Sequence, residues 1–238
     1  MKIAILTTET THHAFFVSQV ASSYRDVRVF IEKKRGSKFC TQASSFDDAV
    51  VEFERNHWFK GKSPLISDFA QVSFLESLNS REAANALREF APAVTLIFGT
   101  GILSRLILES CSPNIFNLHG GDPEMYRGLD SHLWSVYHED FASLITTLHV
   151  ASSTVDTGRI VLQGELSLGG CTSLHQLRAI NTDVCVQLSL SLFYLLDRFG
   201  SVCSRPQRSE GRYYSAMPEA LKEVCVKKFK RHLLGQVT

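Results

Sequence analysis

The sequence predicts an α/β fold in which helices flank a twisted, largely parallel sheet. Short apolar runs of strand length alternate with longer amphipathic stretches of helical length. Strands that alternate with helices in this way are typical of βαβ units, whose strands run parallel. A chain of 238 residues is long enough for one sizeable domain, or for one domain with a small appendage.

The first half of the chain is expected to form two strands and three helices, at residues 2–6, 13–23, 27–31, 45–56 and 80–90. The stretch 45–56 repeats apolar side chains on one helical face and places two aspartates in the first turn, where they complement the helix dipole. For the helix over 80–90, Ser80 is a candidate N-cap and Pro92 lies just beyond the end.

The second half is expected to form four strands and four helices, at residues 94–98, 104–110, 115–118, 130–139, 144–151, 159–168, 173–198 and 218–234. A glycine turn, 99–101, follows the first of these strands, and residues 201–211 have the composition of a polar loop. The predicted architecture is a Rossmann-like sheet over residues 1–170. A short, mostly helical C-terminal extension, residues 171–238, would pack on this core or on a partner subunit.

Composition excludes several classes of protein. The net charge of +1 gives no general attraction to nucleic acid or to a membrane surface. No apolar run approaches the ~20 residues that span a bilayer, and the apolar N-terminus is too short for a signal peptide. No Cys-x-x-Cys pair occurs, so neither a zinc site nor a disulfide framework is indicated, and reduced thiols in the cytoplasm are expected. The six cysteines are Cys40, Cys111, Cys171, Cys185, Cys203 and Cys225.

An amide, an imidazole and a carboxylate carry the candidate chemistry. Asn117 and His119 lie two residues apart at the expected end of a strand, so their side chains point to the same face. Asp156 lies in a turn between two later strands. This set suits acyl transfer to an amine: the amide stabilises an oxyanion, the imidazole polarises or shuttles a proton, and the carboxylate orients the imidazole and helps deprotonate the nucleophile.

Each of these residues also has a plain structural interpretation. A histidine that precedes two glycines, as His119 does, could simply end a strand in a polar loop. Asp156 precedes Thr157 and Gly158, and aspartate and glycine favour turns. The turn and the catalytic interpretations of Asp156 are compatible.

Three motifs in order resemble the folate-dependent formyltransferases. They are Asn117-Leu-His119, Tyr126-Arg-Gly128 and Asp156-Thr-Gly158, and the resemblance covers roughly residues 90 to 165. It implies a formyltransferase core and 10-formyltetrahydrofolate as the formyl donor. By this resemblance, Asn117 and His119 would stabilise the oxyanion of a tetrahedral intermediate, and Asp156 would move the proton of the amine. The resemblance implies no metal and no covalent nucleophile.

The resemblance also assigns residues to the two substrates. Those assigned to the folate donor follow a strand or belong to the loop of about Ser152 to Asp156, the aspartate loop. They are Phe98, Gly99, Thr100, Gly101, Ile102, Leu103, Ser152, Ser153 and Val155. Those assigned to the acceptor precede the first helix or follow the catalytic histidine: His12, His13, Gly120, Gly121, Tyr126 and Arg127. His12 and His13 are equally compatible with the start of a helix, and Arg127 with an ordinary surface position.

The acceptor is inferred by subtraction among members of the family. Methionyl-tRNA formyltransferases carry a C-terminal barrel, for which the residues after the core leave little room, so no nucleic acid partner is expected. Glycinamide ribonucleotide formyltransferases have a glycine-rich phosphate loop after the first strand. This chain has Thr7-Thr-Glu-Thr-Thr-His-His13 there, without glycines, which argues against that substrate. The hydrolases of the family carry an N-terminal regulatory domain. The segment Tyr213-Tyr-Ser-Ala-Met-Pro218 resembles one found in enzymes that formylate nucleotide-linked amino sugars for surface glycans.

An amino-sugar N-formyltransferase is therefore the expected function. The alternatives are a 10-formyltetrahydrofolate hydrolase, a formyltransferase for another small amine, and a non-catalytic folate-binding module. An apolar stripe on the last helix could pack on the chain's own core or on a twin subunit, which leaves a homodimer open. The stripe consists of Leu221, Val224, Cys225 and Phe229.

Overall fold

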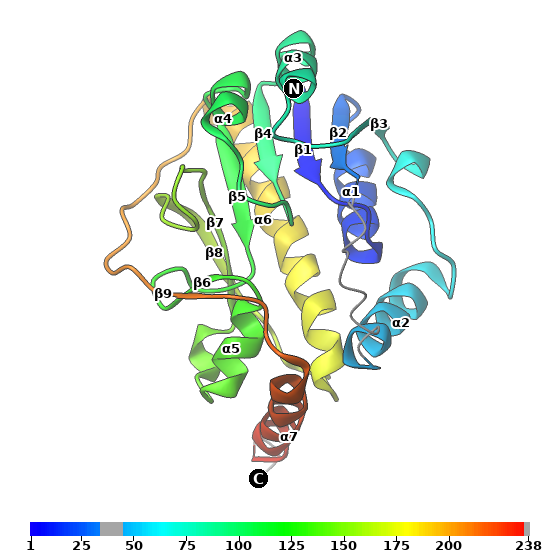
Figure 1. The fold of residues 1–238 in the computed structure, drawn as a ribbon, viewed down its shortest axis with the longest axis vertical. Helices are drawn as coiled ribbons and strands as arrows, with labels where there is room; N and C mark the ends of the chain where they lie inside the picture. The colour runs from blue at the N-terminus through cyan, green and yellow to red at the C-terminus, as the bar shows by residue number, and fades with distance from the viewer. Residues whose placement is uncertain (34–44, 236–238) are drawn as a thin grey trace.

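A seven-stranded sheet runs through the molecule, with helices on both of its faces (Figure 1). The structure is a computed structural model that describes residues 1–33 and 45–235. In spatial order the strands are β3 (Gln71–Leu75), β2 (Val27–Glu32), β1 (Ile3–Thr7), β4 (Val94–Ile97), β5 (Ile115–His119), β7 (Ile145–Val150) and β8 (Ile160–Glu165). The helices are α1 (Thr11–Ser23), α2 (Ser45–Phe59), α3 (Arg81–Phe90), α4 (Arg105–Ser110), α5 (Ser131–Tyr137), α6 (Leu177–Phe199) and α7 (Glu219–Gly235).

The sheet is parallel from β3 to β5, and β7 and β8 join it antiparallel. The prediction of a mostly parallel sheet flanked by helices is confirmed. Strand β1 pairs with β2 on one side and with β4 on the other, so the strand order reverses between β1 and β4. Ligands of such sheets bind beyond the carboxyl ends of the strands at this reversal.

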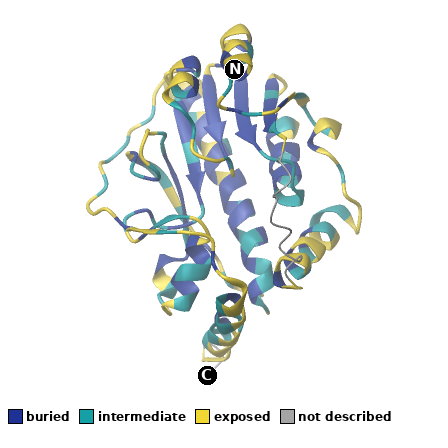
Figure 2. Cartoon of the chain, in the orientation of Figure 1, coloured by how far each residue is buried: buried dark blue, intermediate teal, exposed yellow. Residues whose placement is uncertain are grey.

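Alternation along β1 assigns its side chains to two hydrophobic cores. Ile3 and Ile5 belong to the core that α1 and α6 close, and Ala4 and Leu6 belong to the core under α3 and α4. Side chains two residues apart on a strand share a face, so a continuous apolar run serves both layers. All four side chains are fully buried, as Figure 2 shows for the central strands. The sheet is thus a rigid platform whose carboxyl edge can position polar groups.

Helix α6 is the one described helix that is long and apolar enough to cross a membrane. With the turn before it, the segment Leu174–Phe199 has a mean hydropathy of 1.4, but 61% of the apolar window is buried inside the fold. The expectation that no apolar run approaches membrane length is therefore wrong by length and composition. Its burial against α1, β7 and β8 is the behaviour of the core helix of a soluble protein.

Three short strands, β3, β6 and β9, were not predicted from the sequence. The edge strand β3 mixes polar and apolar residues, and its pattern is half exposed. Two three-residue strands, β6 (Tyr126–Gly128) and β9 (Arg212–Tyr214), form a separate parallel ribbon. The ribbon joins the predicted core to the predicted extension, which is therefore not helical throughout. The hydrophobic core also continues from β1 into α6, and the boundary at residue 170 stays a prediction.

The apolar stripe of α7 packs on the chain's own core. Cys225 and Phe229 are fully buried, the Cys225 thiol donates to the Leu133 carbonyl, and the Phe229 ring meets Phe141. The buried half of the stripe is thus covered within the chain itself. The five described cysteines are free, and Cys40 lies outside the described residues. Within residues 1–33 and 45–235 no group of His, Cys, Asp and Glu could hold a metal ion.

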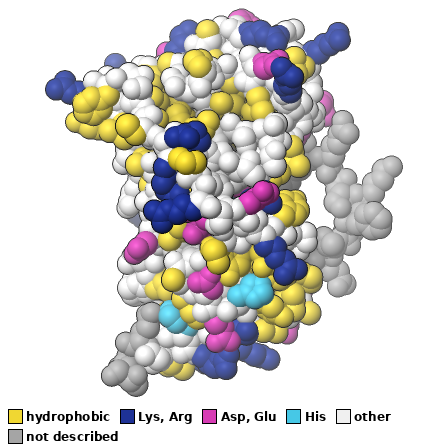
Figure 3. All heavy atoms as spheres, turned by 90° about the vertical axis from the view of Figure 1, so that its left-hand side faces the viewer, with side chains coloured by type: hydrophobic (Ala, Val, Ile, Leu, Met, Phe, Trp, Pro, Cys, Tyr) yellow, Lys and Arg dark blue, Asp and Glu magenta, His cyan; other side chains and the backbone are white. Residues whose placement is uncertain are grey.

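Basic, acidic and apolar side chains are interspersed on the face shown in Figure 3. The lysines and arginines form only small groups there. Helix α7 carries the basic residues Lys227, Lys228, Lys230 and Arg231. Two of these, Lys228 and Arg231, lie within ion-pair distance of Glu139.

Candidate active site

A cavity of about 630 Å³ opens at the carboxyl edge of the sheet. It is lined by residues that follow β1 and β4 and by the end of β5, next to the reversal of strand order. Asn117, His119 and Asp156 all line it, so the structure brings together the three residues that the sequence singled out. Its volume suits a drug-sized ligand.

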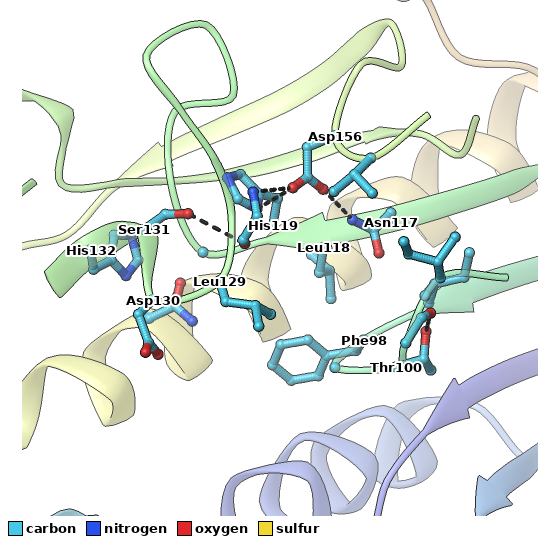
Figure 4. A pocket seen from close by; sticks show the side chains of 18 of the residues that line it. Phe98, Thr100, Asn117, Leu118, His119, Leu129, Asp130, Ser131, His132 and Asp156 are labelled. Carbon is cyan, nitrogen blue, oxygen red and sulfur yellow. Dashed lines mark hydrogen bonds and ion pairs between the residues drawn. The ribbon is translucent and has the colours of Figure 1, made fainter. Parts of the chain in front are cut away.

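Asp156 is the centre of the hydrogen-bond network (Figure 4). Its Oδ2 accepts from the Gly128 backbone N–H at 2.9 Å and lies 3.3 Å from His119 Nδ1. Its Oδ1 accepts from Asn117 Nδ2 at 3.3 Å and lies 3.5 Å from His149 Nε2. Burial raises the pKa of Asp156, but the interactions with His149, His119 and the Gly128 N–H outweigh burial and bring the pKa below the ordinary aspartate value. The carboxylate is therefore ionised at neutral pH.

His119 lies buried at the end of β5 with both ring nitrogens engaged. Nε2 lies 2.8 Å from the carbonyl oxygen of Tyr126, and because a carbonyl can only accept, Nε2 carries a proton. Burial lowers the pKa of His119, and the Asp156 carboxylate opposes that shift. Because Nε2 carries a proton, Nδ1 is the ring nitrogen that faces Asp156 Oδ2, at 3.3 Å. The two groups are placed to take up one proton between Nδ1 and Oδ2.

His149 is a fourth polar residue of the cluster, and the sequence analysis missed it. It is the register partner of Asn117 across the antiparallel β5–β7 pair. Its Nδ1 donates to the Val150 carbonyl at 2.9 Å, which leaves Nε2 to accept from Asn117 Nδ2 at 3.1 Å. A histidine and two threonines within an otherwise apolar strand were the available signal. Only the register shows that His149 faces Asn117.

The orientation of Asn117 follows from these contacts. Both hydrogens of its amide nitrogen are engaged, one by His149 and one by Asp156. The side-chain oxygen consequently turns away from Asp156, as Figure 4 shows. If Asn117 is to donate to an oxyanion, one of these two hydrogens must turn toward it.

The Tyr126-Arg-Gly128 motif supports the aspartate loop. Arg127 donates to the carbonyls of Gly211 and Val155 and pairs with Glu210, so it joins the loop to the segment before β9. Tyr126 is buried and donates to Asp140. Neither side chain lines the cavity. Their predicted contact with the acceptor thus has no geometric support.

The polar segment 201–211 runs over the aspartate loop and fixes its backbone. Asp156 has a positive φ of 55°, which is unfavourable for a residue other than glycine. Gln207 Nε2 donates to the Asp156 carbonyl at 2.8 Å and to the Gly158 carbonyl at 2.9 Å. Arg205 holds the segment in place through two hydrogen bonds with Glu124, which lower the pKa of that carboxyl to about 2. Gln207 therefore fixes the backbone on both sides of Thr157 in the loop that carries Asp156.

We expect Gln207→Ala to lower turnover about 10-fold, because a small displacement of a catalytic group is costly. The loss should fall on kcat, with the thermal midpoint nearly unchanged. Ser209→Ala is the matched control. Ser209 lies on the same segment as Gln207, but its hydroxyl donates to the Glu124 carbonyl and not to the aspartate loop. Equal losses in the two variants would show that only the segment's general stability matters.

All nine residues assigned to the folate donor line the cavity. The backbone N–H groups of residues 100–103 and 153–155 donate to no described residue, so they are available to a heterocyclic ligand. Gly99 has a φ of 71°, and a Cβ there would lie 2.4 Å from the ring of His13. These loops fit a ligand that is recognised by backbone groups, as a pterin would be.

The residues assigned to the acceptor divide into two groups. His12, His13 and Gly120 line the cavity, whereas Gly121, like Tyr126 and Arg127, does not. The Gly121 carbonyl instead accepts from Thr147. Cavity residues that the sequence analysis did not assign to either substrate include Leu129, Asp130, Arg178, Asn181 and Tyr213.

His132, a buried residue of α5, predicts a pH dependence of stability. Burial lowers its pKa from 6.5 to about 4, although Nε2 donates to the Ile145 carbonyl. Because the unfolded state binds the proton more readily, stability is complete above pH ~6.5 and falls toward pH ~4. Between these two pH values the wild type should lose about 3 kcal/mol more of its free energy of unfolding than the His132→Gln variant loses. Urea titrations at several pH values measure it, and parallel curves would contradict it.

Comparison with known proteins gives the fold. No family model and no curated protein matches the sequence. Many solved structures are similar to this chain, among them three that each cover 90% of it. One is a candidate sugar N-formyltransferase from Mycobacterium tuberculosis, with 18% identity, 75% of its chain covered and a TM-score of 0.60. Another is WlaRD, a sugar 3-N-formyltransferase solved with dTDP and 5-N-formyltetrahydrofolate, with 14% identity, 69% covered and a TM-score of 0.58.

The third is an N-formyltransferase from Helicobacter canadensis in complex with folinic acid and dTDP-3-aminofucose. It shares 14% identity with this chain, which covers 71% of it with a TM-score of 0.57. At such identities the likeness establishes the architecture: the chain has the formyltransferase-like α/β fold. Function has to be argued from the site.

Proposed function

We propose that the protein is an N-formyltransferase that moves a formyl group from 10-formyltetrahydrofolate to the amine of a nucleotide-linked amino sugar. One observation carries the proposal. Asn117, His119 and Asp156 converge in a single cavity at the carboxyl edge of a formyltransferase-like sheet. WlaRD is described as a sugar N-formyltransferase, the mycobacterial protein as a candidate one and the Helicobacter canadensis protein as an N-formyltransferase. WlaRD and the Helicobacter canadensis protein each hold a folate together with dTDP or a dTDP-sugar.

The donor would bind between the loop Phe98–Leu103 and the aspartate loop. Both loops line the cavity and offer unpaired backbone N–H groups. Phe98 supplies an apolar wall, and its ring packs edge-on against His13. This placement directs the formyl carbon toward Asn117 and His119.

The amine nitrogen attacks the formyl carbon, and the carbonyl oxygen becomes an oxyanion. The proton that the amine must lose passes to the Asp156–His119 pair, whose Nδ1 and Oδ2 face each other across 3.3 Å. Protonated Asp156 holds the Asn117 amide less strongly, so one N–H can turn to the oxyanion. A donor placed in this way contributes about 3 kcal/mol to the transition state. The carbon–nitrogen bond to the folate then breaks, and the proton passes to the leaving nitrogen.

We further propose that the enzyme acts in the cytoplasm, in the synthesis of surface polysaccharide. We also propose that the enzyme forms a homodimer and that the chain divides into a catalytic core, residues 1–170, and a C-terminal extension, residues 171–238. Size-exclusion chromatography with light scattering decides the oligomeric state.

The proposal is tested by following folate absorbance with purified protein and 10-formyltetrahydrofolate, with and without a panel of nucleotide-linked amino sugars. Release of tetrahydrofolate that depends on one amino sugar is the expected result. Release at the same rate without any amine would instead identify a hydrolase. Tight donor binding without release in the presence of every amine would indicate a non-catalytic module.

A further inference from the structure

The first turns of α6 present two hydrogen-bond donors to the cavity. Arg178 and Asn181 lie three residues apart, so they share one face of the helix, and both line the cavity. Neither residue belongs to the motifs that resemble the formyltransferases. Both side chains are nevertheless held by specific partners, which an incidental cavity wall would not require.

Arg178 is fixed by a buried carboxylate from α2. Its Nε and Nη2 donate to the two oxygens of Glu54 at 2.6 and 2.9 Å, and the Glu54 side chain is fully buried. This two-point contact holds the guanidinium plane in one orientation. The Nη1 group has no partner among the described residues, and the side chain is 36% exposed. Arg178 thus offers a rigid pair of N–H groups to a ligand.

Asn181 is oriented in a comparable way. The buried Thr146 hydroxyl donates to Asn181 Oδ1 at 2.6 Å, so the amide nitrogen is the group left to face the cavity. Nδ2 lies 3.4 Å from the position that a Cβ on residue 120 would occupy. Residue 120 is a glycine that directly follows His119, so the Asn181 amide lies beside the backbone next to His119.

The charges of the cavity indicate what each donor would bind. Arg178 is the one lysine or arginine among the described lining residues. Two lining carboxylates outside the catalytic cluster are already engaged: Asp47 by Lys222, and Asp130 by the Met217 N–H. Arg178 is therefore the available partner for an anionic oxygen. Asn181, beside His119, is placed for a neutral oxygen close to the reacting amine.

We infer that Arg178 and Asn181 form the acceptor-recognition site of this enzyme. Arg178 Nη1 binds a phosphoryl oxygen of the nucleotide diphosphate, and Asn181 Nδ2 binds a sugar oxygen next to the amine. This inference rests on the proposed function. Since Glu54 neutralises the guanidinium, recognition depends on the fixed direction of the N–H groups more than on long-range attraction.

Two conservative substitutions test the inference without removing a buried partner. Arg178→Lys keeps the charge near Glu54 but loses the planar fork. Asn181→Asp keeps the hydrogen bond from Thr146 but loses the donor. The matched controls are Arg88→Lys and Asn85→Asp, which alter an exposed arginine–asparagine pair on α3. Steady-state kinetics are measured for donor and acceptor, and calorimetry measures binding of dTDP and UDP.

Arg178→Lys should weaken binding of the preferred nucleotide about 10-fold and raise the acceptor KM to match, with the donor KM unchanged. Asn181→Asp should lower kcat/KM for the acceptor about 30-fold and leave nucleotide binding unchanged. Both controls should behave as the wild type. Unchanged constants in both variants would overturn the inference, as would failure of the wild type to bind either nucleotide.

The two proposals fail in different places. If the proposed function is wrong, the wild type releases no tetrahydrofolate in response to any nucleotide-linked amino sugar. If only the acceptor site is wrong, the wild type turns over and the variants match it. Equal losses for donor and acceptor would show that Arg178 and Asn181 have a merely structural role, which also overturns the inference.

Discussion

Replacing Asp156 by asparagine is expected to lower turnover at least ~100-fold while the protein stays folded. Asparagine has the same shape and can still accept the Gly128 N–H, so the loop keeps its anchor. It cannot take up the proton that the His119–Asp156 pair is placed to receive. The measurement is kcat for amine-dependent release of tetrahydrofolate, with circular dichroism to establish folding.

Asp68→Asn is the matched control for this substitution. Asp68 also accepts a backbone N–H, from Leu65 at 2.9 Å, and does not line the cavity. It should leave turnover unchanged. Asn117→Ala and His119→Ala should each lower turnover by the same ~100-fold, since each removes a member of the cluster. A normal rate in any folded variant would remove that residue from the mechanism.

The second large effect is expected at Gly158, where the chain packs too tightly for a side chain. A Cβ at this position would lie 1.6 Å from the carbonyl oxygen of Val150. Gly158→Ala must therefore displace backbone next to the aspartate loop, and we expect it to lower the free energy of unfolding by about 3 kcal/mol. Urea denaturation measures the loss. Turnover should fall as well, because the displaced backbone carries Asp156.

Gly169→Ala separates this steric effect from the general cost of replacing glycine. A Cβ at residue 169 would meet only the Ser167 hydroxyl, at an ordinary contact distance of 3.7 Å. Its unfolding free energy should stay close to that of the wild type. If Gly158→Ala were equally mild, the close approach to Val150 would not be a constraint of the folded protein.

The elements that the sequence predicted well are those with strong local signals. Strands β1, β4 and β5 are rich in apolar residues, and α3 has a serine cap whose hydroxyl accepts the Ala83 N–H. Local patterns of this kind reflect burial and capping, which act over a few residues. The positions of Asn117 and His119 at the end of β5 follow from the same local pattern.

The elements that were missed depend on contacts between distant residues. Strands β6 and β9 have three residues each and exist only because they pair across more than 80 positions. His149 joins the site through the antiparallel register of β5 and β7. Gln207 and Asn181 reach it from segments whose composition indicates only a polar loop and a core helix. No local pattern encodes these approaches, so the supporting half of the site required the structure.

The most direct test of the account follows the formyl carbon itself. Purified protein is incubated with 10-formyltetrahydrofolate that carries an isotopically labelled formyl group and with a panel of nucleotide-linked amino sugars, and the products are identified by mass spectrometry. The account predicts that the label appears as a formamide on one amino sugar, with an equal amount of tetrahydrofolate. Recovery of the label as free formate, whether or not an amine is present, would contradict it.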